Sequence, residues 1–205
     1  NSAAILTQGK DIELRDKTLL PTYDIFEEDR YFTSSNNIEP VEVKINGSIV
    51  KLGIHICEDL WNDLSRKKNS LYLSNPVKDL RRENVDFIIN LSSSPFSAGK
   101  QAFRENMLSE VAKKSSVSVL YINQIGGNDD LIFDGRSCAF GEDGSLIGRA
   151  RGFEEDRLVV NLSQTQSNRI EVVDESNEEI YKALVLGTRD YVRKCGFSRV
   201  VLGLS

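Results

Sequence analysis

The feature that most constrains the fold of this chain is an alternation of strand-like and helix-like segments between residues 52 and 124. The apolar runs typical of strands lie at 48–56, 85–91 and 117–124, and the helical patterns between them lie at 76–83 and 100–114. Such alternation is typical of a layered α/β core, in which helices cover a sheet. Asn46-Gly47 and Asp143-Gly144 each predict a hairpin near one end of this region. We therefore expect a mixed sheet packed by helices, and not a purely parallel one.

Weaker patterns complete the expected element order. We expect a short strand within 1–10, a further strand over 158–162 and an amphipathic helix over 180–194. In the helix expected over 100–114, the apolar residues at helical spacing are Phe103, Met107, Leu108 and Val111. The polar and acidic segment 163–179 has no pattern that would bury a face, so we interpret it as a linker. The last residues resemble the beginning of a strand, and we expect the chain to be a fragment of a longer protein.

Composition narrows the class of protein. The chain has 205 residues, 40% of them hydrophobic, and a net charge of -5, which argues against a general nucleic-acid-binding protein. No apolar run approaches the roughly 20 residues of a membrane span, and from the pattern of the first residues we expect no signal peptide. The three cysteines are far apart and form no CxxC motif. We therefore expect no disulfide framework, no zinc site, structural roles for Cys138 and Cys195, and a reducing, cytoplasmic location.

One predicted strand leads directly into a cluster of reactive groups. Gly53, His55 and Cys57 share a face of its pleat, because side chains two residues apart point the same way. Cys57 stands at the carboxyl end of this strand, just before Glu58-Asp59. Ligands of α/β proteins bind at that edge, and a turn there can aim backbone N–H groups at an oxyanion. Cys57 is therefore a candidate nucleophile, the alternative being a small buried cysteine, while we interpret His55 as a packed histidine.

Two further predicted strands also end in polar residues. Ser92 to Ser94 precede Pro95, and Asn123-Gln124 precede a pair of glycines. If the three strands are neighbours in one sheet, these clusters line one edge and form a site with Cys57.

A resemblance to a known family rests on five segments that occur in the family's order. They are K-x-x-L-P-x-Y-x-x-F-x-E-x-R-Y-F from Lys17, then I-C-E-D-L-W, N-L-S-x-S-P-F, Y-x-N-Q-x-G-G-x-D and F-D-G-x-S. The chain resembles the glutamine-hydrolysing domain of glutamine-dependent NAD synthetases, which belongs to the nitrilase superfamily. The likeness runs from residue 1 to about 162. The tail 180–205 is similar to the opening of the synthetase domain, in which Ser205 would begin a nucleotide-binding, pyrophosphate-holding loop.

The resemblance implies both a fold and a domain division. The fold is a nitrilase-type α-β-β-α sandwich, an α/β layered fold, incomplete at its N-terminus. Residues 1–162 would be the C-terminal part of a nitrilase-like glutaminase domain, and residues 163–179 the linker. Residues 180–205 would begin a truncated NAD synthetase domain of the ATP-pyrophosphatase type.

The resemblance also implies a Glu-Lys-Cys triad. Cys57 would be the nucleophile and Lys17 the lysine, whereas the glutamate base lies upstream of residue 1 in the family. We expect Glu28 to orient Lys17 and Glu58 to lie near the oxyanion, and the fragment alone to be inactive without its base. The residues expected to contact glutamine are Tyr23, Ser94 and Lys100. Taken singly, these residues have ordinary alternatives, such as a solvated lysine or a serine in a turn.

The implied activity is hydrolysis of glutamine to supply ammonia for the ATP-dependent conversion of deamido-NAD into NAD. We expect no cofactor in this chain, and ATP with Mg in the synthetase domain. The expected partners are glutamine, deamido-NAD, ATP and a second copy of the chain in a homo-oligomer, without nucleic acid or membrane. Two alternatives stay open: a stand-alone nitrilase-superfamily C–N hydrolase acting as an amidase, and a non-catalytic α/β assembly module.

Overall fold

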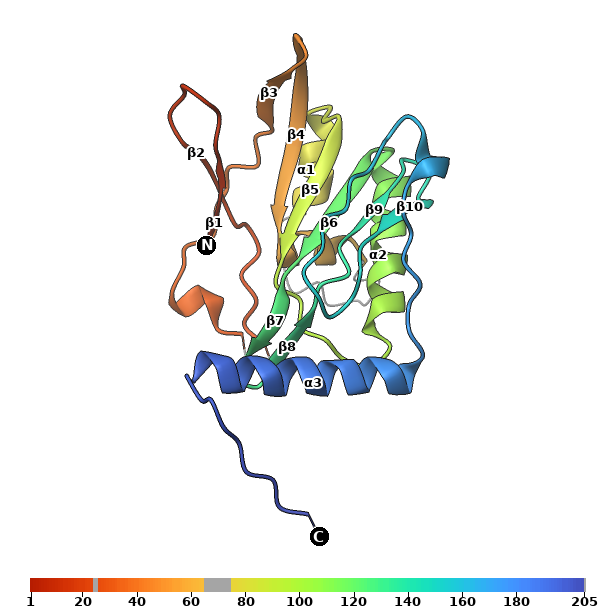
Figure 1. Ribbon diagram of the computed structural model, residues 1–205. Helices are drawn as coiled ribbons and strands as arrows, with labels where there is room; N and C mark the ends of the chain where they lie inside the picture. Colours follow the sequence, from red (N-terminus) through yellow and green to blue (C-terminus); the bar gives the residue numbers. More distant parts are fainter. Residues whose placement is uncertain (24–25, 65–74, 205) are drawn as a thin grey trace.

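A mixed six-stranded sheet forms the centre of the computed structural model, which describes residues 1–23, 26–64 and 75–204 (Figure 1). In spatial order the strands are β10 (Leu146–Arg149), β9 (Cys138–Phe140), β6 (Ser118–Asn123), β5 (Phe87–Ser92), β4 (Ser48–Ile56) and β3 (Val41–Ile45). β4, β5 and β6 run parallel, and the remaining pairs are antiparallel. The expectation of a mixed sheet with a hairpin at each end is confirmed.

Both predicted hairpins form because their turns hold residues that tolerate positive φ. Asn46 and Gly47, between β3 and β4, have φ of 49° and 86°, the signs that a two-residue hairpin turn of type I′ needs. Gly144, between β9 and β10, has φ of 78°. A Cβ at Gly144 would lie 2.7 Å from the carbonyl oxygen of Ser109, so a side chain does not fit between this turn and α2.

Two helices, α1 (Pro76–Arg82) and α2 (Lys100–Ser115), cover one face of the sheet (Figure 1). The apolar core between the helices and the sheet includes Val77, Leu80, Ile88, Met107, Leu108, Val111 and Val119. Phe103 does not belong to this core, although it was expected among the apolar residues of the helix. Its side chain is 57% exposed and stacks on Trp61 with ring centroids 5.8 Å apart. The buried stripe of α2 instead runs through Gln101 and Arg104, since polar partners at the strand ends lie beneath the first turns of this helix.

The opposite face of the sheet carries apolar side chains that are less buried. Leu91 is 39% exposed and Ile122 is 42% exposed. Residues 158–162 pass beside this face, but the strand expected there does not form. Its side chains pack on the sheet at Gly148, whereas the N–H of Asn161 donates to the side chain of Asn168 and not to a neighbouring strand.

Two small hairpins and a long helix flank the sheet. β1 (Ser2–Ile5) pairs with β2 (Glu13–Asp16), and β7 (Ile125–Asn128) pairs with β8 (Leu131–Asp134). Only the first of these four strands was expected, because the others are short and lack a clear apolar alternation. Helix α3 (Ser176–Lys194) crosses the edge of the sheet at which β4, β5 and β6 end (Figure 1).

The contact between α3 and β7 depends on two glycines. A Cβ at Gly127 would lie 3.0 Å from the Cα of Gly187, so the helix approaches the hairpin closely. Asp190 accepts a hydrogen bond from the N–H of Gly127 at 2.8 Å, and Lys194 donates to the carbonyl oxygen of Gly127. Helix α3 thus begins within the segment interpreted as a linker and packs on the preceding residues, and the domain boundaries stay a prediction.

Residues beyond α3 do not form the expected strand within 197–204. This segment extends away from the rest of the chain (Figure 1), and Val201 is fully exposed. A strand needs a neighbouring strand to satisfy its backbone N–H and C=O groups, and none pairs with this segment among the described residues.

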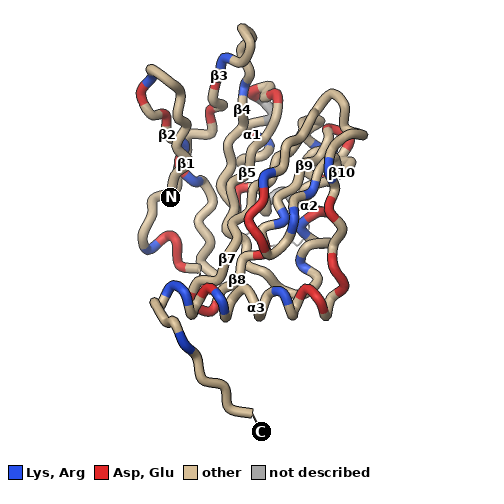
Figure 2. Tube along the Cα trace, in the orientation of Figure 1, with Lys and Arg blue, Asp and Glu red and all other residues tan. Residues whose placement is uncertain are grey.

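Figure 2 shows basic and acidic residues interspersed along α3. No described helix combines the length and apolarity that crossing a bilayer requires.

Candidate active site

Cys57 lies at a sharp turn between β4 and the 3₁₀ helix η2 (Cys57–Leu64). Its φ is +45°, a left-handed conformation that costs an L-residue on the order of 1 kcal/mol. The amide of Asn90 on β5 donates to the carbonyl oxygen of Cys57 at 3.3 Å and helps to hold this turn. The prediction that a strand ends at Cys57 in a turn is therefore confirmed.

A cavity of about 540 Å³ opens beside Cys57. The sequence-predicted site residues that line it are Lys17, Tyr23, Glu28, Cys57, Glu58, Ser94 and Lys100. They come from the segment after β2, from the turn after β4, from the loop after β5 and from the start of α2. The fold thus brings together every predicted site residue except Ser205, which lies outside the described residues, and their chemical roles stay a prediction.

Lys17 is a buried cation that pairs with the carboxylate of Glu28. Its side chain is 1% exposed, and its Nζ donates to Glu28 Oε1 at 2.6 Å. Asn1 donates to the other oxygen of Glu28 at 3.1 Å, so this carboxylate is held from two sides. A buried ammonium needs such a partner because desolvation disfavours its charged form. The contact expected between Glu28 and Lys17 is therefore present.

Electrostatics act in opposite directions on the Cys57 thiol. Burial raises its pKa above the ordinary value, the positive charge of Lys17 lowers it, and the negative charge of Glu58 raises it again. A thiolate is the nucleophilic form of cysteine. The charge of Lys17 therefore favours the thiolate, against the effects of burial and of Glu58.

Two more predicted residues have defined partners at the cavity. Tyr23, 42% exposed, donates its hydroxyl to Glu58 Oε2 at 2.8 Å, and Glu58 itself is buried. Lys100, the first residue of α2, donates its ammonium to the carbonyl oxygen of Pro95 at 2.9 Å and lies 6.0 Å from the ring centre of Trp61. Burial lowers the pKa of Lys100, and the nearby charge of Arg104 lowers it further.

Asn123, at the end of β6, holds the loop that carries Ser94, a role that the sequence analysis did not assign. Its Oδ1 accepts a hydrogen bond from the N–H of Ser94 at 2.9 Å, and its Nδ2 donates to the Ser94 carbonyl oxygen at 3.3 Å. The buried Ser94 hydroxyl has no hydrogen-bond partner within residues 1–23, 26–64 and 75–204. The polar ends of neighbouring strands β5 and β6 were the signal that could have predicted this contact.

The walls of the cavity include apolar side chains that the sequence analysis did not single out. They are Phe26, Trp61, Phe96 and Leu131. Leu131 belongs to β8, and sequence patterns did not predict that strand. Such a mixture of apolar walls with a few convergent polar groups is typical of small-molecule sites.

His55, Cys138 and Cys195 do not line this cavity. His55 is 1% exposed, and burial lowers its pKa to about 4, which fits a neutral packed histidine. Cys138 is buried and Cys195 is exposed. Among the described residues, no group of three or more His, Cys, Asp or Glu side chains is arranged to hold a metal ion.

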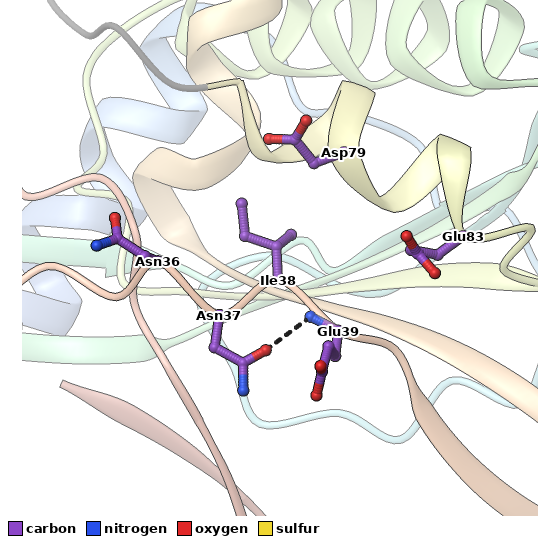
Figure 3. A pocket seen from close by; sticks show the side chains of 6 residues that line it. All are labelled: Asn36, Asn37, Ile38, Glu39, Asp79 and Glu83. Carbon is purple, nitrogen blue, oxygen red and sulfur yellow. Dashed lines mark hydrogen bonds between the residues drawn. The ribbon is translucent and has the colours of Figure 1, made fainter.

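A second hollow, of about 560 Å³, lies between residues 36–39 and α1 (Figure 3). Asp79 on α1 and Glu83 just after this helix lie on the side of the hollow opposite residues 36–39, and the N–H of Glu39 donates to the side chain of Asn37. Its described lining holds carboxylates and amides but no cysteine, lysine or histidine. It therefore lacks the nucleophile and the cation that the cavity beside Cys57 combines.

The chain matches a known protein family and several named proteins. The family model for carbon-nitrogen hydrolases matches residues 1–171. The chain belongs to the carbon-nitrogen hydrolase family. It is also similar over its whole length to the glutamine-dependent NAD(+) synthetases of Synechocystis sp., at 45% identity, and of Acinetobacter baylyi, at 37% identity.

A solved structure supports the fold assignment. The glutamine-dependent NAD+ synthetase from Acinetobacter baumannii, in complex with ADP, matches the whole chain with a TM-score of 0.84 and 37% identity. The chain covers 37% of that structure's chain, 37% of the Synechocystis relative and 36% of the Acinetobacter baylyi relative. The mixed α/β fold expected from the resemblance to the nitrilase superfamily is confirmed.

Proposed function

We propose that this chain is the glutamine-hydrolysing part of an ATP-dependent NAD synthetase that converts deamido-NAD into NAD, and that this part supplies the ammonia. The observation that carries the proposal is the cavity lined both by Cys57, in a left-handed turn, and by the buried Lys17. The curated relatives named glutamine-dependent NAD(+) synthetase, which match the entire chain, support the substrate assignment.

The chemistry follows from the residue types at the cavity. The Cys57 thiolate attacks the side-chain amide carbon of glutamine and forms a tetrahedral intermediate. Lys17 and a backbone N–H just after Cys57 stabilise the oxyanion of this intermediate. Collapse of the intermediate breaks the C–N bond, releases ammonia after proton transfer to nitrogen, and leaves a thioester that water hydrolyses to glutamate.

We assign substrate contacts to three residues. Ser94, Tyr23 and Lys100 line the cavity, and their side chains carry a hydroxyl, a phenol and an ammonium. These groups match the ammonium and carboxylate ends of an amino acid. Glu28 and Glu58 are already bound to Lys17 and Tyr23, respectively, so we assign them orienting roles. The glutamate base is expected outside this chain, and the chain alone is expected to lack turnover.

The nucleotide chemistry is assigned to the remainder of the synthetase. ATP and Mg would act there, with Ser205 at the start of a nucleotide-binding loop, and no step of glutamine hydrolysis uses them. Residues 180–205 would begin that domain, after a linker at 163–179. Cytoplasmic location and homo-oligomer formation belong to the same proposal.

A stand-alone amidase would use the same cysteine and lysine. The family model ends at residue 171, whereas the synthetase relatives match the chain to its end, including α3. This additional match favours the synthetase over the amidase. An inert assembly module would not need a strained cysteine and a buried lysine beside a cavity.

The test is Cys57→Ala in the full-length protein, with Cys195→Ala as the matched control because Cys195 is exposed. The expected result is loss of glutamine-dependent NAD formation by at least about 10⁴-fold, as for loss of other nucleophiles, with ammonium-dependent formation unchanged. NAD formation is followed by chromatography with each nitrogen donor. A folded Cys57→Ala protein that still uses glutamine, or that loses ammonium-dependent synthesis, would contradict the proposal.

A further inference from the structure

Asp59 is a buried carboxylate that contacts two segments far apart in the sequence. Asp59 is 3% exposed. One oxygen, Oδ1, accepts hydrogen bonds from the backbone N–H groups of Thr18 at 3.2 Å and Leu19 at 2.7 Å. The other, Oδ2, accepts from the N–H of Ile56 at 2.9 Å. The carboxylate therefore joins the segment after β2 to the end of β4.

Two of these three N–H groups belong to residues next to Lys17 and Cys57. Thr18 directly follows Lys17, and Ile56 directly precedes Cys57. Both segments are thus fixed within one residue of the two groups that face the cavity. The Lys17 backbone has further support, because its carbonyl oxygen accepts from the N–H of Ser35 and its N–H donates to the carbonyl oxygen of Asn1. Only Asp59, among these contacts, reaches the Cys57 turn as well.

The bond to Ile56 also bears on the conformation of Cys57. A left-handed φ in an L-residue persists only where neighbouring contacts hold the chain on both sides. Asn90 holds the carbonyl oxygen of Cys57, and Asp59 holds the N–H of the preceding residue. Together they fix the two peptide groups that flank the cysteine.

The chemistry of this position calls for a carboxylate. An ionised carboxylate accepts at both oxygens and has the capacity for these three bonds. An asparagine accepts at one atom only, and its NH₂ group would meet at least one N–H donor. Burial raises the pKa of Asp59, its hydrogen bonds to backbone N–H groups and the charge of Lys17 lower it, and the net result is a pKa of about 6. The three N–H donors favour the ionised form of this side chain.

We propose that Asp59 is a positioning residue, which sets the distance between the Lys17 ammonium and the Cys57 sulfur through the two backbone segments that it joins. This inference deepens the proposed glutamine hydrolysis and rests on it for its biological meaning. Asp59 does not line the cavity, so it acts through Lys17 and Cys57 and not on the substrate.

The experiment measures the pH dependence of Cys57 alkylation by chloroacetamide in the full-length protein carrying Cys195→Ala, with the labelled peptide quantified by mass spectrometry. Asp59→Asn should raise the midpoint of this profile by about one pH unit, because the two released segments let the Lys17 ammonium move away from the thiolate. Below the midpoint, alkylation should slow about 10-fold. The matched control is Asp86→Asn, since Asp86 accepts from the N–H of Lys51 at the other end of β4, outside the cavity. Its midpoint should not move.

A double variant separates positioning from a general structural effect. In a Lys17→Met background, Asp59→Asn should cause no further shift of the midpoint, because the charge that it positions is already gone. An equal shift in both backgrounds, or no shift in either, would overturn the proposal. If Asp59→Asn does not fold, Asp59→Glu is tested in its place, with the same expected shift and the same dependence on Lys17.

These measurements are independent of the proposed substrate. Alkylation needs only the thiol and the probe, so its outcome decides the role of Asp59 without reference to glutamine. Failure of the proposed function would be seen instead as glutamine-dependent synthesis that survives Cys57→Ala.

Discussion

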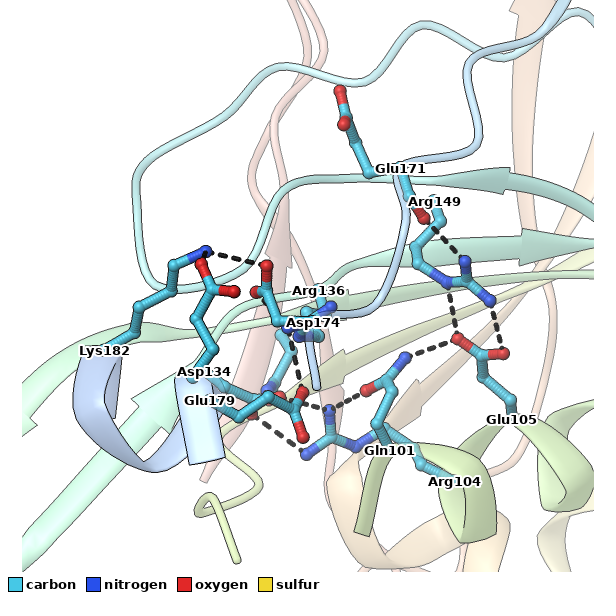
Figure 4. A network of polar contacts seen from close by, with 12 residues as sticks. Gln101, Arg104, Glu105, Asp134, Arg136, Arg149, Glu171, Asp174, Glu179 and Lys182 are labelled. Atoms are coloured by element: carbon cyan, nitrogen blue, oxygen red, sulfur yellow. Dashed lines mark hydrogen bonds and ion pairs between the residues drawn. The ribbon is translucent and has the colours of Figure 1, made fainter. Parts of the chain in front are cut away.

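Two groups of buried charges can be compared, those that line the cavity beside Cys57 and those in a network of ion pairs that joins α2, β8, β10 and α3 (Figure 4). In the network, Arg104 donates from two nitrogens to Asp134, at 3.1 and 3.2 Å. Arg149 likewise donates from two nitrogens to Glu105, both at 2.7 Å. These paired geometries match guanidinium to carboxylate and leave no room for a ligand between the charges.

Arg136 continues the network to α3. It is 1% exposed and pairs with Asp174 at 3.0 Å and with Glu179 at 2.9 Å. Its guanidinium also lies 5.6 Å from the ring centre of Phe153. In the cavity, by contrast, Lys17 pairs with Glu28 beside open volume and a reactive thiol. The comparison teaches that burial of a charge does not by itself indicate catalysis, and that the space around the charge distinguishes the two cases.

The largest effect on stability should come from breaking the network. Arg136→Met should destabilise the packing of α3 by about 3–5 kcal/mol, because it leaves the buried carboxylate of Glu179 without its guanidinium partner. Hydrogen exchange of the α3 amides in the full-length protein measures this local opening. Unchanged exchange together with a large loss of glutamine-dependent activity would place Arg136 with the cavity instead.

Lys17→Met should affect glutamine-dependent activity strongly and stability less. We expect glutamine-dependent kcat to fall about 10²–10³-fold, roughly 3–4 kcal/mol, as for removal of an oxyanion-stabilising donor, while ammonium-dependent synthesis is retained. The loss of stability should be smaller than for Arg136→Met, since the freed Glu28 carboxylate faces the cavity and keeps its bond from Asn1. Steady-state kinetics with both nitrogen donors, together with exchange of the α3 amides, measures the two effects. Equal losses in both reactions would contradict the assignment of Lys17 to glutamine hydrolysis.

The smallest effect should come from the rim of the network. Lys182 pairs with Asp174 at 2.7 Å and with Glu178 at 2.9 Å, but its side chain is 38% exposed. Lys182→Ala should cost less than about 1 kcal/mol, because water screens exposed ion pairs, and the cost should decrease further in high salt. Exchange of the α3 amides at two ionic strengths checks this, and a cost as large as that of Arg136→Met would show that the outer pairs carry the packing of α3.

Local sequence patterns predicted the elements whose formation depends on neighbouring residues. Alternating apolar residues predicted β4, and the Asn46-Gly47 turn predicted its pairing with β3. The same patterns did not predict the β7–β8 hairpin, whose short strands contain two glycines and are stabilised by contact with α3. Phe103 was assigned to the apolar stripe of α2 because helical spacing alone does not distinguish a buried face from a ring that stacks on Trp61.

For the candidate site, the sequence by itself determined which chemical groups are present and that Cys57 ends a strand in a turn. The order of the five segments, through their resemblance to a family, then selected Lys17 and the expected substrate-binding residues. Only the tertiary structure decided that Lys17 is buried against Glu28, that Asn123 holds Ser94, and that Asp59 joins the Lys17 segment to the Cys57 turn. The physical reason is that these contacts join segments distant in sequence, whose approach depends on sheet order and on the satisfaction of buried backbone N–H groups, which no local spacing encodes.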